Sequence, residues 1–152
     1  MRIGWIVGPE PVIERLADIK MQTDYGSSSL SQYAVDKWLS SGMYETFLKE
    51  IREALRFRRD FTIQILADYF SDIATWNVPQ GGFYIWLRIQ SGVSSGKLFD
   101  LALREGILLN PGSVYEKYDS EHLRLSYSYA SIEQLKSGLI TLSQLIRKAS
   151  SK

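Results

Sequence analysis

One arginine in this sequence has the setting of an anion-binding residue. Arg124 alternates with Leu123 and Leu125, and this period of two predicts a strand with one buried face. The polar face of that strand would carry Arg124 beside Ser126 and Ser128. A guanidinium beside two hydroxyls can bind a carboxylate through two parallel hydrogen bonds. The alternative is an arginine that faces solvent on a half-exposed sheet, and the spacing alone leaves both interpretations open.

Three other features could carry chemistry and are weaker. Arg2 adjoins an apolar run and could pair with a phosphate or a carboxylate, although a residue at a chain end is usually only solvated. His122 is the sole histidine, and a single histidine before a strand is typical of a structural or surface residue. Gly81-Gly82 is followed by neither a P-loop lysine nor a helix, which favours a hairpin turn over a phosphate-binding loop.

Composition excludes several classes of protein. The chain has 152 residues, 45% hydrophobic and 23% charged, as expected for a globular domain. Its net charge of +1 provides no electrostatic reason to bind nucleic acid or an anionic membrane. It has no cysteine and one histidine, so we expect no disulfide, no thiolate zinc site and no other metal centre. No apolar run approaches the ~20 residues of a membrane-spanning helix, and we expect a cytoplasmic protein.

Hydrophobic periodicity predicts the elements that position these residues. Apolar steps of three and four indicate helices, and alternation indicates strands. Ser29 with Gln32, and Ser131 with Gln134, have the spacing of capping boxes. We expect helices that open near residues 9, 29, 44, 94 and 131, and strands over 2–7, 76–78, 83–89, 107–109 and 123–127. The helices and strands fall into separate runs, which predicts an α+β fold.

Two of these elements carry further expectations. In the strand over 83–89, Phe83, Ile85 and Leu87 should share one face, with Gly81-Gly82 at the turn of a hairpin. The long helix over 44–70 carries a cluster of arginines at its middle. A charge run on a helix is usually a solvated face, and we expect that role for the cluster Arg56, Arg58 and Arg59.

An ordered set of segments resembles a known family. The set comprises Arg2-Ile3-Gly4-Trp5, Ser28-Ser29-Leu30-Ser31-Gln32, Pro79-Gln80-Gly81-Gly82-Phe83-Tyr84-Ile85-Trp86-Leu87, Asn110-Pro111-Gly112-Ser113 and Leu123-Arg124-Leu125-Ser126-Tyr127-Ser128. It resembles the C-terminal half of fold-type-I pyridoxal-phosphate enzymes, the aminotransferase class I/II family. The sequence of residues 2–16 and 74–87 most resembles that of MocR-type transcriptional regulators, a branch of the GntR superfamily. Aminotransferases of the aminoadipate and kynurenine type carry similar segments.

The resemblance implies roles for both arginines and a division of the chain. By this likeness, Arg2 contacts the phosphate of pyridoxal phosphate and Arg124 binds the substrate's α-carboxylate. Residues 1–42 would be the tail of the large cofactor-binding domain, and residues 43–152 the small C-terminal domain. The turn from Tyr25 to Ser28 resembles the loop that approaches the partner subunit's cofactor in a homodimer. The family's Schiff-base lysine lies upstream of Arg2, so we expect no catalytic residue here and only weak cofactor binding.

Three functions follow as hypotheses. The first is the effector-sensing part of a regulator, which binds an amino acid or amine through pyridoxal phosphate and contacts DNA only through a segment outside this chain. The second is a fragment of a working aminotransferase, which transfers an amino group to a 2-oxo acid. The third is a non-catalytic interaction module, in which Arg2 and Arg124 share no ligand. Likeness of fold alone does not decide between these functions.

Overall fold

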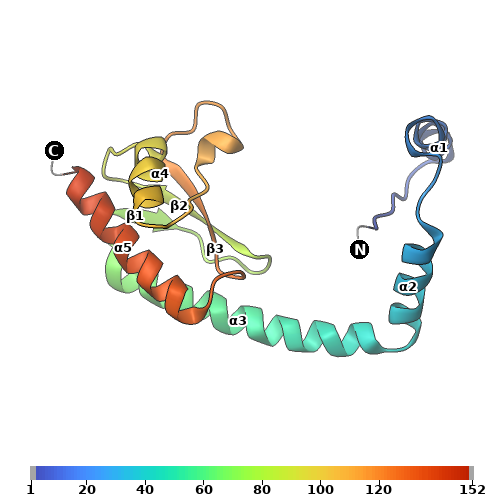
Figure 1. Ribbon diagram of the computed structural model, residues 1–152, viewed down its shortest axis with the longest axis horizontal. Coiled ribbons are helices and arrows are strands. Elements are labelled where there is room, and N and C mark those ends of the chain that lie inside the picture. Colours follow the sequence, from blue (N-terminus) through green and yellow to red (C-terminus); the bar gives the residue numbers. More distant parts are fainter. Residues whose placement is uncertain (1–2, 151–152) are drawn as a thin grey trace. The chain divides into compact units, whose positions relative to one another are not determined.

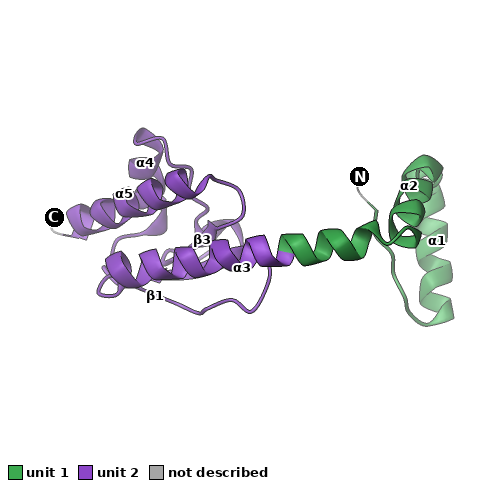
Figure 2. Cartoon of the chain, turned by 90° about the horizontal axis from the view of Figure 1, so that it is seen from below, with its two compact units in different colours: residues 1–51 green, residues 52–152 purple. Residues whose placement is uncertain are grey.

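The computed structural model describes residues 3–150 and has α+β architecture, as predicted (Figure 1). The chain divides into two compact units, residues 1–51 and 52–152 (Figure 2). The long helix α3, Met43–Phe70, begins in the first unit and ends in the second. No helix within residues 3–150 is long and apolar enough to cross a membrane.

The first unit contains two further helices, both close to their predicted positions. Helix α1, Glu10–Asp24, has a proline in its first turn, where the missing N–H costs no hydrogen bond. Helix α2, Ser29–Ser40, begins one residue earlier than the predicted capping box requires. The hydroxyl of Ser28, not of Ser29, accepts the N–H of Ser31 at 3.3 Å, and the Ser28 carbonyl accepts the N–H of Gln32.

The predicted strand over residues 2–7 is wrong for the residues that the structure describes. Residues 3–7 form no regular element, and Trp5 is 81% exposed. Backbone groups of a strand need a neighbouring strand as partner, and the described part of the first unit contains no strand. Arg2 lies outside the described residues.

The second unit is built on a three-stranded antiparallel sheet in the order β1-β2-β3. Its strands are β1, Ala74–Trp76, β2, Tyr84–Ile89, and β3, His122–Ser126. Trp86 lies opposite Arg124 in the register of β2 and β3. Strand β1 pairs antiparallel with β2, with Trp76 opposite Leu87, which confirms the predicted hairpin. Its first strand lies over 74–76 instead of the predicted 76–78. Phe83 precedes β2 and is 49% exposed instead of sharing its buried face.

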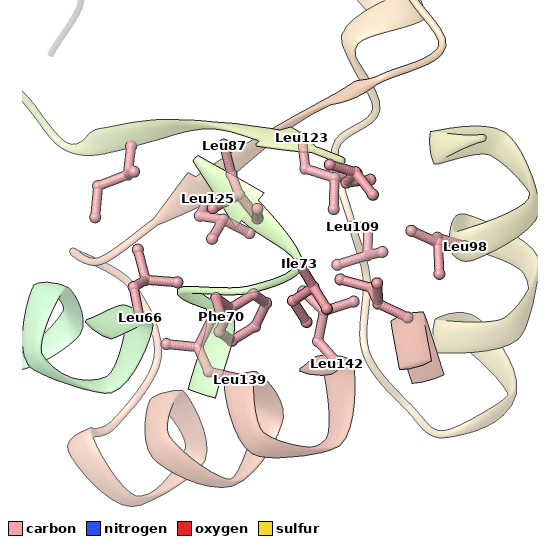
Figure 3. Packing of buried hydrophobic residues seen from close by; sticks show 14 of the residues in the cluster. Leu66, Phe70, Ile73, Leu87, Leu98, Leu109, Leu123, Leu125, Leu139 and Leu142 are labelled. Carbon is pink, nitrogen blue, oxygen red and sulfur yellow. The ribbon is translucent and has the colours of Figure 1, made fainter. Parts of the chain in front are cut away.

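One face of this sheet packs on helices to form the core. Burial alternates along β2 and β3, as the period of two predicts. Figure 3 shows leucines of both strands beside Phe70 of α3 and residues of the last helix, α5, Ile132–Ser150. Several of these side chains are fully buried: Leu66, Phe70, Leu87, Leu98 and Leu123.

The segment after helix α4, Ser95–Arg104, differs from its prediction. Ser94 caps this helix, and Gly106, with a φ of 74°, follows its end. Residues 107–109 form no strand, although Leu109 is buried. This segment pairs with β3 at an isolated bridge between Pro111 and Leu123, and proline has no N–H with which to extend the bridge into a ladder.

Helix α5 begins at the predicted capping box. The Ser131 hydroxyl accepts the N–H of Gln134 at 3.1 Å, and the Gln134 side chain accepts the N–H of Ser131 at 3.0 Å. Near its end, Arg147 forms an ion pair with Asp72, and hydrogen bonds from Arg147 lower the pKa of that carboxyl. This pair joins α5 to the turn that follows α3.

The prediction that the arginine cluster of α3 is simply solvated is wrong for one member and incomplete for another. Arg58 donates from Nε to the Tyr127 carbonyl at 2.6 Å and from its terminal nitrogen to the Ala130 carbonyl. Arg59 donates to the Pro79 carbonyl at 3.3 Å. Arg56 is exposed. The accepting carbonyls lie in loops, where no neighbouring strand donates to them, so they need a side-chain donor. The helical pattern of α3 does not reveal this need.

Candidate functional site

The candidate site lies on the sheet face opposite the core. Tyr84 and Trp86 of β2 and His122, Arg124 and Ser126 of β3 occupy this face. The register brings these side chains together, because residues opposite each other on an antiparallel pair have neighbouring Cβ atoms. The sequence pattern predicts Arg124 on this face, and the structure places it there, half-buried.

Two tyrosine rings contact the guanidinium of Arg124. Its central carbon lies 4.0 Å from the ring centroid of Tyr84 and 4.8 Å from that of Tyr115. Both distances are within the range of cation–π attraction. Tyr84 is on the neighbouring strand, whereas Tyr115 comes from the loop between Pro111 and β3. Arg124 is therefore held by aromatic faces rather than by an acid.

The backbone N–H of Arg124 donates to the Asn110 carbonyl at 2.9 Å, but its guanidinium forms no hydrogen bond within residues 3–150. Its Nε is buried and has no hydrogen-bond partner, and no carboxylate in residues 3–150 forms an ion pair with it. A buried donor without a partner carries a desolvation penalty of about 1–3 kcal/mol. A carboxylate that reached this nitrogen would remove that penalty.

The loop that carries Tyr115 is attached to β3 through Asp119. One carboxylate oxygen of Asp119 accepts the N–H of Glu121 at 3.0 Å and the N–H of His122 at 3.1 Å. The same oxygen lies 2.9 Å from Nδ1 of His122. Burial acts to raise the pKa of Asp119, but the bonds from the His122 ring and the two amides outweigh it, so the pKa is lowered.

Gly112 allows this loop to close. It is buried at the start of a short 3₁₀ turn, Gly112–Val114, and a Cβ added there would lie 2.3 Å from a carboxylate oxygen of Asp119. Only a residue without a side chain fits this approach.

Aromatic contacts continue from the loop to the histidine. The Trp86 ring meets the Tyr115 ring edge-on, with 5.7 Å between ring centroids, and stacks on the His122 ring, with 5.4 Å between centroids. His122 is thus fixed by Trp86 on one side and by Asp119 on the other. Its position favours the structural role expected from the sequence over that of a general base.

Hydrogen bonds also fix the residues that follow Arg124 in the sequence. The hydroxyls of Ser126 and Ser128 lie 3.2 Å apart, so each has a partner in the other. The hydroxyl of the buried Tyr127 donates to the Gly82 carbonyl at 2.6 Å, and burial raises the pKa of Tyr127. The end of β3 is therefore attached to the loop that precedes β2.

A cavity of about 210 Å³ opens beside Arg124 and Ser126. Its other walls are mostly apolar and include Leu109, Tyr129 and Leu139. Every lysine that the structure describes is exposed, so none lies in apolar surroundings that would make it a nucleophile. No group of three or more potential metal ligands occurs within residues 3–150.

Sequence reasoning missed Tyr84 and Tyr115 as members of the site. Tyr84 alternates with Ile85, so the period of two already places it on the face of Arg124. Tyr115 lies in a loop without periodicity, and no local signal connects it to a strand residue nine positions further on. The second predicted site residue, Arg2, lies outside the described residues.

Comparison with known proteins identifies the class first by its fold. The structure superposes on an archaeal alanine:glyoxylate aminotransferase with a TM-score of 0.89 at 22% identity, over 97% of this chain and 37% of that one. It also matches LysN, an α-aminoadipate aminotransferase from Thermus thermophilus complexed with N-(5'-phosphopyridoxyl)-L-leucine, with a TM-score of 0.86 at 24% identity. That match covers 95% of this chain and 38% of LysN. At these identities the likeness establishes the fold.

The family follows from the sequence. The model of the family "Aminotransferase class I and II" matches residues 1–140, and the chain belongs to this family. Curated relatives are named as transcriptional regulators. The relative named "Uncharacterized HTH-type transcriptional regulator YdfD" of Bacillus subtilis (strain 168) is 48% identical over 152 residues, 100% of this chain and 32% of YdfD. The HTH-type transcriptional regulator NorG of Staphylococcus aureus (strain USA300) is 42% identical over 149 residues, 97% of this chain and 34% of NorG.

These findings confirm the resemblance on which the sequence analysis relied. The chain is an aminotransferase-like segment whose curated relatives are HTH-type regulators. It spans about a third of the length of the curated relatives it matches.

Proposed function

We propose that this chain forms the C-terminal part of the effector-sensing domain of a MocR-type regulator of the GntR superfamily. In this proposal Arg124 binds the carboxylate of an amino-acid effector. The observation that carries it is the half-buried guanidinium with an unpartnered Nε, held between aromatic rings with no acid paired to it in the described chain. The names of the curated relatives support regulation over catalysis.

Pyridoxal phosphate is the cofactor that this proposal assigns to the full-length protein. When bound, it supplies an aldehyde that reacts with an amine. The described residues fit the part of the ligand that carries a carboxylate, because a planar guanidinium matches a carboxylate and the buried Nε of Arg124 has no hydrogen-bond partner. Arg2 is proposed for the cofactor phosphate, and neither a lysine for the aldehyde nor a base is assigned within this chain.

Effector binding must favour one domain arrangement if it is to transmit a signal. We assign residues 1–42 to the end of the large domain and residues 43–152 to the small domain, with α3 as the connection. The full-length protein would act as a homodimer and bind DNA through a segment outside this chain.

Catalytic amino-group transfer is the second candidate, and the names of the structural neighbours support it. The solved structures named above are aminotransferases, and the Arg124 site would serve an amino-acid substrate equally well. A regulator and an enzyme therefore differ in what surrounds this chain rather than in its own residues. Measurements of operator binding and of amino-group transfer by the full-length protein distinguish the two.

Two probes test the role of Arg124 directly. N-(5'-phosphopyridoxyl)-glycine and N-(5'-phosphopyridoxyl)-methylamine differ only in a carboxylate, so the ratio of their Kd values isolates its contribution. The full-length protein without cofactor should bind the glycine probe more tightly. Arg124→Leu should reduce this preference by about tenfold to a hundredfold, the equivalent of a charged hydrogen bond worth about 1.5–3 kcal/mol.

Arg88→Leu is the matched control for this test. Arg88 lies on the same sheet face, but it is exposed and already paired with Glu121. Its replacement should leave the ratio of the two Kd values unchanged. A preference for the glycine probe that survives Arg124→Leu, or is absent from the unaltered protein, would overturn the proposed role of Arg124.

A further inference from the structure

We propose that Tyr115 is a positioning residue that holds the guanidinium of Arg124 ready for a carboxylate. This inference rests on the proposed function, because it assigns Tyr115 a part in the same site. It predicts that carboxylate recognition depends on an aromatic ring in the loop between Pro111 and β3, and not on Arg124 alone.

Arginine loses conformational freedom when it binds a ligand. A free arginine side chain carries about 2 kcal/mol of rotamer entropy, which is lost when the side chain is fixed on a ligand. Contact with the rings of Tyr84 and Tyr115 fixes the guanidinium before any ligand arrives. Pre-organisation of this kind improves affinity by lowering the cost of ordering on binding.

The rings that hold Arg124 carry no negative charge. An acid beside Arg124 would fix it as well, but would also occupy the donors that a ligand needs. The faces of aromatic rings attract a cation without accepting hydrogen bonds from its N–H groups in the plane of the guanidinium. The unpartnered Nε of Arg124 agrees with this arrangement. An aromatic holder therefore does not pair with the N–H groups of the arginine, and its buried Nε stays without a partner.

Neighbouring residues hold the Tyr115 ring and its loop in place. Trp86 meets its ring at 5.7 Å, and Asp119 attaches the end of the loop to the amides of Glu121 and His122. Gly112 permits the close approach of the Asp119 carboxylate at the beginning of the loop. Tyr115 is thus held at both ends of its loop, although it is 48% exposed.

The ring of Tyr115, and not its hydroxyl, carries the proposed role. Its contacts in the described structure are the ring contacts to Arg124 and Trp86. Tyr115→Phe should therefore keep the function, and Tyr115→Leu should lose it. Tyr118 lies in the same loop, is 84% exposed and contacts Lys117 but not Arg124, so Tyr118→Leu is the matched control.

The test measures the Kd values of the glycine and methylamine probes for these variants of the full-length protein without cofactor. Tyr115→Leu should reduce the preference for the glycine probe by about fivefold, the equivalent of one partly buried cation–π contact. Its Kd for the methylamine probe should stay unchanged, which shows that the variant is folded. Tyr115→Phe and Tyr118→Leu should keep the preference within about twofold.

Each other result has a defined meaning. If Tyr115→Leu weakens both probes equally, the ring has only a structural role and the inference is overturned. If Tyr115→Leu leaves the preference intact while Arg124→Leu removes it, the inference fails and the proposed function stands. If Arg124→Leu itself leaves the preference intact, the proposed function fails, and the inference fails with it.

Discussion

At the scale of the residue, the site depends on the hydrogen bonds that the Asp119 carboxylate accepts. Its bonds to two amides and to His122 outweigh the effect of burial on its pKa, so the carboxylate stays charged and holds the loop. The loop in turn carries the Tyr115 ring. Glycine at position 112 allows the loop to pass close to the Asp119 carboxylate, because a side chain there would occupy the space of that carboxylate.

Gly112→Ala should therefore destabilise the chain by about 2 kcal/mol, within the range for overpacking a tight contact. The added Cβ would lie 2.3 Å from an oxygen of Asp119, so the carboxylate or the turn must move. Chemical denaturation of the 152-residue chain measures the change in free energy of unfolding.

Gly138→Ala is the control for this substitution. Gly138 lies within α5, and a Cβ added there meets nothing within 4 Å. The replacement should stabilise the chain by about 0.5–1 kcal/mol, because alanine favours the helix over glycine. Equal effects of the two substitutions would contradict the proposed contact between residue 112 and Asp119.

At the scale of the element, helix α3 does more than provide a core face. Arg58 reaches across to the segment after β3 and donates to the carbonyls of Tyr127 and Ala130. The hydroxyl of Tyr127 also donates to the Gly82 carbonyl. Hydrogen bonds therefore join the end of β3 both to α3 and to the loop before β2. This arrangement holds the strand that carries Arg124.

Arg58→Leu should destabilise the second unit by about 2 kcal/mol, because it leaves two carbonyls without their charged donor. Arg56→Leu is the matched control: Arg56 lies on the same helix and is exposed, so its replacement should change the free energy of unfolding by less than about 0.5 kcal/mol. Urea denaturation of both variants compares them directly. If Arg58→Leu behaves like Arg56→Leu, the hydrogen bonds of Arg58 contribute nothing to stability.

At the scale of the whole molecule, burial is distributed unequally between the two units. Among residues 3–150, the buried hydrophobic residues all lie at position 65 or beyond, in the second unit. In the described part of the first unit no residue is buried, and apolar side chains such as Trp5, Leu30 and Tyr33 are largely exposed. Helices without a buried apolar face derive little stability from packing.

Hydrogen exchange of the 152-residue chain should reveal this difference. Amides of α1 and α2 should open locally at low cost, whereas those around Leu87 in β2 and Leu139 in α5 should exchange only on global unfolding. We expect exchange at least about 100-fold slower in the second group, a gap of roughly 2.7 kcal/mol or more. Uniform protection along the chain would show that the two units form a single cooperative structure.

Local patterns in the sequence are sufficient to predict most elements and one site residue. The alternation in β2 and β3 specifies which side chains face the core, and it places Arg124 on the opposite face. The capping box at Ser131 and the long helix α3 are likewise encoded within a few consecutive residues. Such features depend on backbone geometry and neighbouring side chains, which a short window of sequence contains.

Only the tertiary structure determines which distant residues meet. Tyr115 reaches Arg124, Arg58 binds carbonyls some seventy residues further on, and Gly112 accommodates Asp119 because the path of the chain brings them together. The strands predicted over 2–7 and 107–109 are absent from the described residues for the same reason, since an apolar run forms a strand only where a neighbouring strand accepts its hydrogen bonds. Contacts of this kind depend on the arrangement of the elements in space, which no local period encodes.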